Sequence, residues 1–362
     1  MPDASSPLEN EIRRLIAIAG PMPLAEYMRL CLTHPEHGYY LLRDAIGDGG
    51  DFVTAPEISQ MFGELAGLWC VQAWFDQGRP PHARLVELGP GTGSLMEDAL
   101  RAAKLAPEFR EAVEIVMVDA NPALVVRQKA RLANAGVSVT WQAQFDESLC
   151  NWPLFLIANE FFDALPIRQF VKTARGWCEN MVTVDAGHNL APALSPDPLP
   201  LDVPAERGEA GDGAVYETSP ASTALAEEIG RAITSRGGAA LIVDYGYSGA
   251  GFGDTLQAVG EHQFKDVLST PGEIDLSAHV DFDALARAAE RGGAAGFGPV
   301  TQGELLTGLG ILDRMMALRH RNPGGQAEIA QAVDRLINPD QMGALFKALA
   351  ILPKTAPSPP GF

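Results

Sequence analysis

The chain has 362 residues, 46% of them hydrophobic, which is enough to bury a large core and excludes a chain that is disordered throughout. Its 27 Lys and Arg residues stand against 46 Asp and Glu residues, so the net charge is −19. Such a charge repels nucleic-acid phosphates and favours basic partners, and we expect no nucleic-acid partner.

Cysteine usage and the N-terminal residues indicate the compartment. The four cysteines are widely spaced and form no C-x-x-C pair, so we expect reduced thiols and no metal site. The start of the chain has neither the pattern of a signal peptide nor that of a transit peptide, and no apolar run reaches membrane-spanning length. These features predict a cytoplasmic protein of bacterial type that does not insert into a membrane.

The first part of the chain predicts small helices ahead of a core. Residues 8–32 have helical apolar spacing, and a further helix start follows, where Thr54 is a candidate N-cap and Glu57 can complete a capping box. The stretch 49–57 is rich in glycine and acid. We expect it to lie over a bound cofactor, with Thr54, Glu57 and Ser59 near that ligand; the alternative is that Thr54 and Glu57 only cap the helix.

Residues 85–93, Leu-Val-Glu-Leu-Gly-Pro-Gly-Thr-Gly, form the most informative motif. An apolar strand runs into a loop with alternate glycines, Gly89, Gly91 and Gly93, which opens onto a helix; this order is typical of a nucleotide-binding turn. The G-x-G-x-x-G spacing of dinucleotide sites is missing, and Glu87 would repel a pyrophosphate. An acid suits a cofactor with an ammonium and a sulfonium, so the motif predicts S-adenosylmethionine.

The next two strands supply further candidates for binding this cofactor. Residues 114–119 predict a parallel strand that ends in Asp119, an acid placed to accept the ribose hydroxyls, with Ala120 directly after it. The polar loop at 142–148 follows the third strand, where a doubly wound fold would hold the adenine. Asp146 is therefore a candidate for an adenine contact.

A fourth, continuously apolar strand ends in polar residues at 159–163. Ligands of open parallel sheets bind at the carboxyl ends of the strands, and this strand delivers Asn159, Glu160 and Asp163 to that edge. Polar groups leaving a buried strand are costly unless a ligand uses them, although Asn159 and Asp163 can also serve as helix caps. We expect Asn159 near the cofactor and the two acids near a cationic acceptor such as a guanidinium.

The second half of the chain predicts an insertion and one more core strand. Residues 167–185 alternate as a β-hairpin, and 185–213 lacks periodicity, which predicts a long surface loop or mobile segment. Residues 239–247 form a further buried strand. His279 is a candidate to orient a substrate or accept a proton, and equally a candidate for a satisfied structural histidine.

These elements predict an α/β fold with a doubly wound, mostly parallel, Rossmann-like sheet. We expect an N-terminal helical segment at 1–80, a core at 81–300 with an insertion at about 167–215, C-terminal helices at 301–352 and a disordered tail at 353–362.

Four motifs in this order resemble the MidA-type family of S-adenosylmethionine-dependent methyltransferases. They lie at 51–59, 87–93, 159–166 and 275–282, and the resemblance runs from about residue 34 to 282. It implies a class I methyltransferase fold with S-adenosylmethionine as the cofactor. Mitochondrial members assist the assembly of respiratory complex I and are protein arginine methyltransferases, so the resemblance implies a protein acceptor with an accessible arginine, such as a complex I subunit.

The corresponding mechanism gives each acidic candidate a role. Glu160 and Asp163 would hold the guanidinium bidentately, and His279 would accept a proton. Three alternatives stay open: an assembly factor that keeps the cofactor pocket without turnover, a methyltransferase of a small molecule, and, disfavoured by the glycine spacing, a nicotinamide-dependent oxidoreductase.

Overall fold

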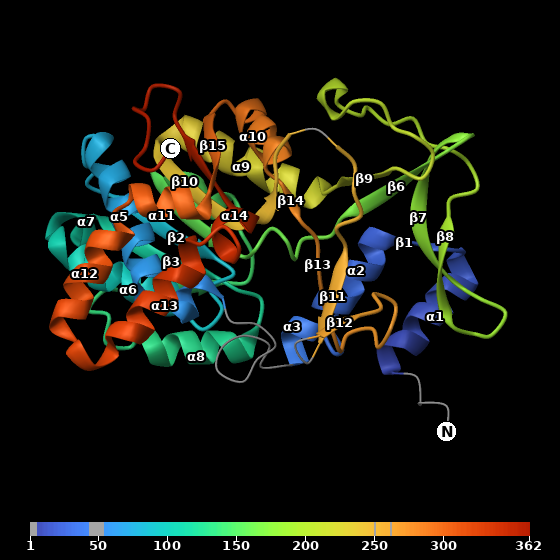
Figure 1. Cartoon of the computed structure of the whole chain (residues 1–362), viewed down its shortest axis with the longest axis horizontal. Helices are drawn as coiled ribbons and strands as arrows, with labels where there is room; N and C mark the ends of the chain where they lie inside the picture. Colours follow the sequence, from blue (N-terminus) through green and yellow to red (C-terminus); the bar gives the residue numbers. More distant parts are fainter. Residues whose placement is uncertain (1–5, 43–53, 250, 261–262) are drawn as a thin grey trace. The chain divides into compact units, whose positions relative to one another are not determined.

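The computed structural model describes residues 6–42, 54–249, 251–260 and 263–362 (Figure 1). It divides the chain into two compact units, each built from three separate stretches. Unit 1 comprises residues 1–45, 163–222 and 248–279, and unit 2 comprises residues 46–162, 223–247 and 280–362. Because both units draw on distant stretches, they do not coincide with the continuous segments expected at 1–80 and 81–300.

Unit 2 is built on a twisted sheet with the strand order β15-β16-β10-β5-β2-β3-β4. The strands are β2 (Ala83–Leu88), β3 (Val113–Val118), β4 (Val139–Gln142), β5 (Leu154–Asn159), β10 (Gly238–Tyr247), β15 (Ala295–Thr301) and β16 (Phe346–Leu352). The strands from β4 to β10 pair in parallel, whereas β16 is antiparallel to both of its neighbours. Short β14 (Val280–Asp281) extends the end of β10. The doubly wound, mostly parallel sheet confirms the predicted fold class.

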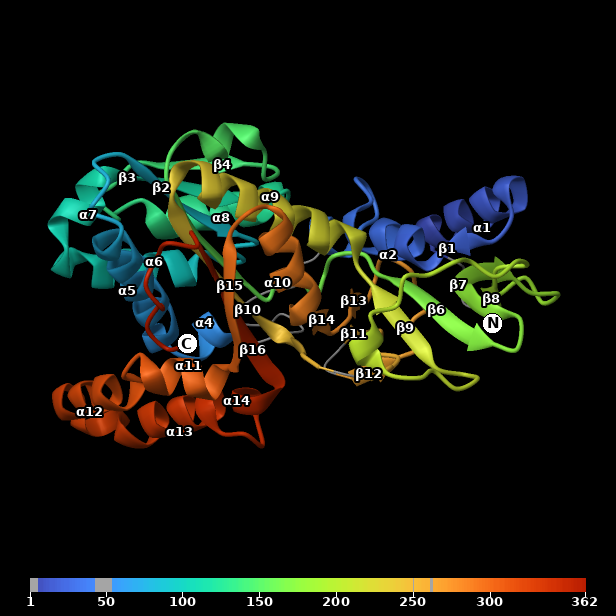
Figure 2. The same cartoon turned by 90° about the horizontal axis from the view of Figure 1, so that it is seen from above.

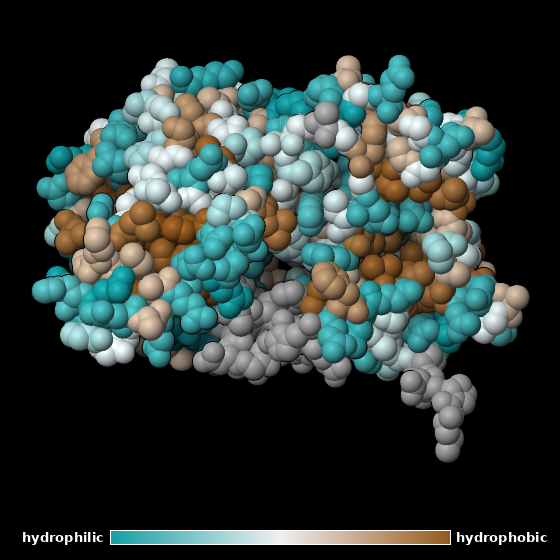
Figure 3. Space-filling view, viewed as in Figure 1, coloured by the Kyte–Doolittle hydropathy of each residue, from teal (hydrophilic) through white to brown (hydrophobic). Residues whose placement is uncertain are grey.

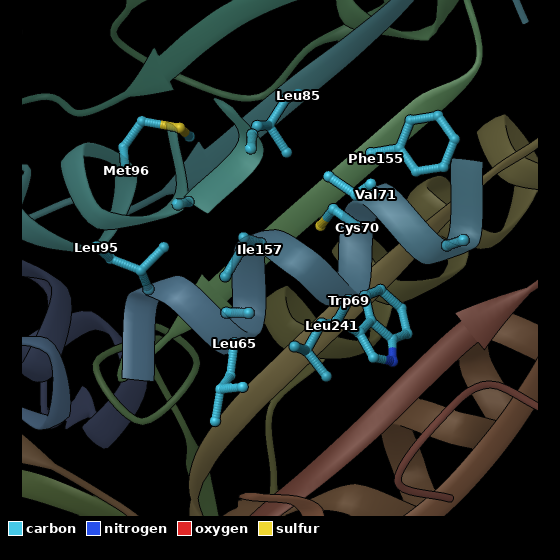
Figure 4. Packing of buried hydrophobic residues seen from close by; sticks show 14 of the residues in the cluster. Leu65, Trp69, Cys70, Val71, Leu85, Leu95, Met96, Phe155, Ile157 and Leu241 are labelled. Carbon is cyan, nitrogen blue, oxygen red and sulfur yellow. The ribbon is translucent and has the colours of Figure 1, made fainter. Parts of the chain in front are cut away.

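Helices cover both faces of this sheet. They are α4 (Ala55–Ile58), α5 (Gln60–Asp76), α6 (Ser94–Ala102), α7 (Pro107–Ala112), α8 (Pro122–Leu132), α9 (Pro220–Arg236) and α10 (Phe282–Arg291). Buried on nearly all sides, α5 crosses the sheet with its side chains among Phe155, Ile157 and Leu241 (Figure 4). Figure 2 shows α9 and α10 on the other side of the sheet. The end of β5 and the loop after β2 therefore lie at the edge of a sheet that has helices on both faces.

The C-terminal part of unit 2 differs from the sequence prediction in two places. Helices α11 (Gln302–Gly308), α12 (Ile311–Arg321), α13 (Gln326–Ile337) and α14 (Met342–Leu345) form as expected, but residues 346–352 are the strand β16. A short, continuously apolar run fits a buried strand and a buried helix equally well, and pairing with β10 and β15 decides the matter. The predicted disordered tail is also wrong, because the Phe362 ring packs 6.5 Å from that of Trp69.

Unit 1 contains the helices α1 (Pro7–Ala19), α2 (Leu24–Thr33) and α3 (Tyr39–Leu42) and two small sheets. One sheet comprises β1 (Met22–Pro23), β7 (Gly176–Val184), β6 (Arg168–Thr173), β9 (Val215–Thr218) and β8 (Leu190–Leu194); the other comprises β12 (Gln263–Lys265), β11 (Gln257–Gly260) and β13 (Asp275–Ser277). Antiparallel β6 and β7 confirm the predicted hairpin. The expected long loop at 185–213 contains β8 instead, a Pro-containing edge strand paired with β7.

No helix in the part of the chain that the structure describes is long and apolar enough to cross a membrane.

Candidate functional site

The glycine loop between β2 and α6 adopts a backbone that needs glycine. Gly89, Gly91 and Gly93 have φ values of 61°, 53° and 83°, a region that L side chains rarely adopt. A Cβ at Gly89 would also come within 2.7 Å of the Phe161 ring, just after β5. The loop therefore passes unusually close to the segment that follows the fourth parallel strand.

Glu87, two residues before this loop, is a buried carboxylate that is only partly satisfied. The residue is 3% exposed, the Met96 amide donates to the carboxylate, and Oε2 has no hydrogen-bond partner among the described residues. Burial, and to a smaller extent Asp119, raise the pKa of Glu87 well above its usual range. An unmatched buried carboxylate oxygen is costly, so this site fits a cationic ligand such as the ammonium of S-adenosylmethionine.

Asp119, at the end of β3, is held by a residue that the sequence prediction missed. Gln128 of α8 is fully buried and donates to Asp119 Oδ2 at 2.7 Å and to the Gly91 carbonyl at 2.8 Å, while its own oxygen accepts from Trp141 Nε1 at 2.9 Å. Asp119 Oδ1 accepts from the Asn121 amide at 2.8 Å. Asp119 stays half-buried, so its carboxylate is placed to accept further bonds from a ribose.

Glu57 lies beside the glycine loop, but not as the predicted capping box. The Thr54 side chain makes no cap hydrogen bond. Instead Glu57 Oε1 accepts from Ser94 Oγ at 2.9 Å and from Thr92 Oγ1. Ser59 caps α5 by accepting from the Met61 amide at 3.2 Å. Cofactor contacts of Thr54, Glu57 and Ser59 stay a prediction.

Part of the stretch expected to cover the cofactor, residues 49–53, lies outside the described residues, as does the beginning of the motif at 51–59.

The end of β5 concentrates acceptors and backbone strain. Glu160 has a φ of 51°, which is uncommon for a non-glycine residue. Its Oε1 accepts from the Ala55 amide at 3.0 Å and from Asn159 Nδ2 at 3.1 Å. Asn159 is 8% exposed, and its Oδ1 has no partner in the described part of the chain. A ligand that donates hydrogen bonds would satisfy this oxygen.

Asp244 of β10 fixes the backbone after β5. It is fully buried, and its Oδ2 accepts from the amides of Phe161 at 3.1 Å and Phe162 at 2.9 Å. In the sequence this residue is only an acid near the end of a buried strand. Its role in holding the neighbouring segment depends on the pairing of β10 with β5.

The other two predicted catalytic residues belong to unit 1, whereas Glu160 belongs to unit 2. The Asp163 carbonyl accepts from the Ala278 amide at 3.0 Å, which brings Asp163 next to the segment that carries His279. The His279 amide donates to Thr255 Oγ1 at 3.0 Å. The joint use of Glu160, Asp163 and His279 on one guanidinium stays a prediction.

Asp146 and Ala120 are the remaining residues that the sequence predicts at the cofactor. Asp146 Oδ1 accepts from the Ser148 amide at 2.8 Å and caps a short 3₁₀ helix. Hydrogen bonds with the Ser148 side chain and with its amide lower the pKa of Asp146. Ala120 is exposed directly after Asp119. Adenine contacts by Asp146 and a cofactor contact at Ala120 stay predictions.

Comparison with known proteins points in one direction. Residues 65–300 match a family described as S-adenosyl-L-methionine-dependent methyltransferase. The mitochondrial protein arginine methyltransferase NDUFAF7 of mouse is 37% identical over 96% of this chain and 85% of the relative, and that of human is 35% identical over 97% and 85%. A crystal structure from Burkholderia thailandensis bound to S-adenosyl-homocysteine is 30% identical, with a TM-score of 0.84 over 98% of this chain and 93% of that one.

One prediction is contradicted by these relatives. The proteins from mouse, human and Drosophila melanogaster are all named as mitochondrial, which overturns the cytoplasmic location expected from the start of the chain.

Proposed function

The chain belongs to the family of S-adenosyl-L-methionine-dependent methyltransferases, and from this membership we propose that it methylates an arginine side chain of a protein. The names of the similar mouse and human proteins support arginine as the acceptor. The resemblance described above adds a respiratory complex I subunit, or a similar protein, as the partner. The observation that carries the proposal is the group of acceptor atoms at the end of β5.

The cofactor pocket is assigned to residues at the carboxyl ends of β2 and β3. We propose that Glu87 faces the ammonium, that Asp119 accepts from the ribose hydroxyls, and that Gly89, Gly91 and Gly93 let the ligand approach the backbone. When bound, S-adenosylmethionine supplies a methyl group that is already activated. The chain therefore has to place the attacking nitrogen in line, and orientation of this kind can supply several kcal/mol.

The acceptor site matches the donor pattern of a guanidinium. Arginine presents five N–H donors and no acceptor. Asn159 Oδ1, next to the Glu160 carboxylate, is an acceptor that has no partner among the residues described by the structure. The strained backbone at Glu160 supports a functional role for that position. We propose that Glu160 binds the guanidinium together with Asp163, and that His279 accepts the proton that the methylated nitrogen loses.

The proposal is tested with labelled S-adenosylmethionine, a mitochondrial lysate and the purified protein, followed by mass spectrometry of the labelled proteins. We expect methylarginine in a protein of the lysate. Glu160→Gln should lower this labelling about 100-fold, because it removes one partner of a charged pair, while the calorimetric affinity for S-adenosylmethionine stays within about two-fold. Glu111→Gln, at an exposed position of unit 2, is the matched control.

The outcomes separate the alternatives. Full activity of Glu160→Gln refutes the role of Glu160. Label that appears only in low-mass compounds points to a small-molecule acceptor. Cofactor binding with no transfer to any acceptor points to an assembly factor without turnover.

A further inference from the structure

Unit 1 contains a cavity that the methyl-transfer site does not use. It has a volume of about 210 Å³ and lies between β7, the start of α2 and the segments around β11 and β12. Leu24, Met181, Leu256 and Val267 are among its apolar walls. One water molecule occupies about 30 Å³ in the liquid. The cavity is several times larger than this, and we infer that it has room for one long side chain. Figure 3 shows hydrophobic residues gathered on the face of unit 1 that is turned toward the viewer.

One side of the cavity is polar and is organised by a single amide. Gln169, which is 2% exposed, donates through Nε2 to Asp254 Oδ1 and to Glu217 Oε1, both at 2.7 Å. Its own oxygen accepts from Asn180 Nδ2 at 2.9 Å. Because every group of this amide is engaged, it holds two carboxylates close together at fixed positions.

Asp254 contributes its carboxylate to the cavity wall, whereas Glu217 lies outside that wall. Glu217 is buried, and burial raises its pKa; hydrogen bonds from Thr255 and Gln169 oppose this shift, and the nearby Asp254 adds a smaller increase. Neither carboxylate forms an ion pair with another residue in the described ranges. Asp254 is exposed to solvent, so a ligand can reach it. Apolar walls beside the Asp254 carboxylate suit a side chain with an aliphatic stem and a cationic head.

We propose that this cavity binds a basic side chain of the protein acceptor, an arginine or lysine near the residue that is methylated. The proposal rests on the function proposed above. The apolar walls would pack against the aliphatic stem, and the Asp254 carboxylate would form an ion pair with the guanidinium or ammonium group.

The cavity is connected to the candidate site through hydrogen bonds within unit 1. Thr255 Oγ1 donates to Glu217 and accepts from the His279 amide at 3.0 Å. An acceptor that occupies the cavity is thus held by the same network that holds the backbone at His279. We expect this connection to give the cavity a part in acceptor selection.

The test uses a fluorescein-labelled, glycine-rich peptide with two arginines and a leucine, and an analogue in which citrulline replaces both arginines. Citrulline keeps the size of the side chain but removes its charge. Fluorescence anisotropy with the full-length protein should show at least about ten-fold tighter binding of the arginine peptide. Asp254→Asn should weaken binding of that peptide at least about five-fold without changing the affinity for S-adenosylmethionine.

Two further variants make the result specific. Asp212→Asn, an exposed position of unit 1 that does not line the cavity, changes the net charge equally and should bind the arginine peptide like the wild type. Met181→Ala shortens one wall and should weaken binding of both peptides by a similar factor of about two to five.

The proposal is overturned if Asp254→Asn binds the arginine peptide as tightly as the wild type does, or if the citrulline peptide binds equally well, which would mark the cavity as a purely apolar site. Failure of the proposed function has a different signature. Peptide binding would still depend on Asp254, but no protein in the lysate would be labelled.

Discussion

The Glu87 carboxylate is buried at a cost in free energy. Its side chain has lost water, and its Oε2 has found no donor among the residues described. The raised pKa expresses this penalty on the ionised form. A cation bound beside Glu87 would stabilise the ionised form and lower that pKa. Binding of the cofactor and release of a proton are therefore coupled at this residue.

The first prediction concerns pH. The affinity for S-adenosylmethionine, measured by calorimetry, should rise as the pH rises through the raised pKa of Glu87, because the cation binds the ionised form. Glu87→Gln should bind at least about ten-fold more weakly and lose most of this pH dependence. Without cofactor the same variant should unfold at a higher temperature at alkaline pH, where the wild type carries the buried charge. A variant that keeps the wild-type pH profile would show that another group is responsible.

Helix α4 has only four residues, yet it takes part in hydrogen bonds with two other segments. Glu160 accepts from the amide of Ala55, the first residue, and Glu57 accepts from the hydroxyls of Thr92 and Ser94. The helix thereby links the end of β5 with the glycine loop. Since one of these regions is proposed to hold the acceptor and the other the cofactor, α4 is placed to connect the two.

The second prediction follows from this link. Glu57→Ala leaves two buried hydroxyls without their acceptor, at a cost of about 1 to 3 kcal/mol. We expect a lower melting temperature and an affinity for S-adenosylmethionine reduced about ten-fold, measured by thermal denaturation and calorimetry. Glu57→Gln keeps one acceptor oxygen and should retain more of both quantities. Equal behaviour of Glu57→Ala and the wild type would remove Glu57 from the pocket.

The sequence predicts those elements whose signal is local. The parallel strands β2, β3, β5 and β10 follow from apolar runs that end in polar residues, and the glycine loop follows from its spacing. In contrast, β16 is an apolar run like many buried helices, and only its two partner strands identify it.

The same limit applies within the site. Glu57 was predicted either to complete a capping box or to lie near the cofactor. The capping box does not form, and the hydrogen-bond partners of Glu57, Thr92 and Ser94, lie 35 and 37 positions away in the sequence. Gln128 was missed because a single glutamine in a helix gives no sign that the fold buries it between β3, β4 and the glycine loop. Long-range contacts of this kind have no local pattern.

Each of the two units is assembled from three stretches that are distant from one another in the sequence. Within unit 2, Glu64 of α5 ties the C-terminal helices to the core. It is 4% exposed and accepts from Arg314 of α12 at 2.7 and 2.9 Å and from Arg101 of α6 at 3.1 Å. These arginines offset the burial of Glu64 and lower its pKa. The C-terminal helices are therefore part of the methyltransferase core.

The third prediction tests this tie. Arg314→Met removes the bidentate partner of a buried carboxylate and should lower the free energy of unfolding by about 3 kcal/mol, measured by urea titration at neutral pH. Arg321→Met, at an exposed position of the same helix, is the matched control and should change stability by less than about 0.5 kcal/mol. If both variants are equally stable, the ion pairs of Glu64 do not anchor α12.

The position of β16 has a consequence for biosynthesis. Strands β10 and β15 both leave the ribosome before residues 346–352, yet each uses β16 as a neighbour in the finished sheet. During translation these two strands therefore lack this neighbouring strand until residues 346–352 have been synthesised. A nascent chain stalled just before Phe346 would thus present exposed strand edges to chaperones or to other nascent chains.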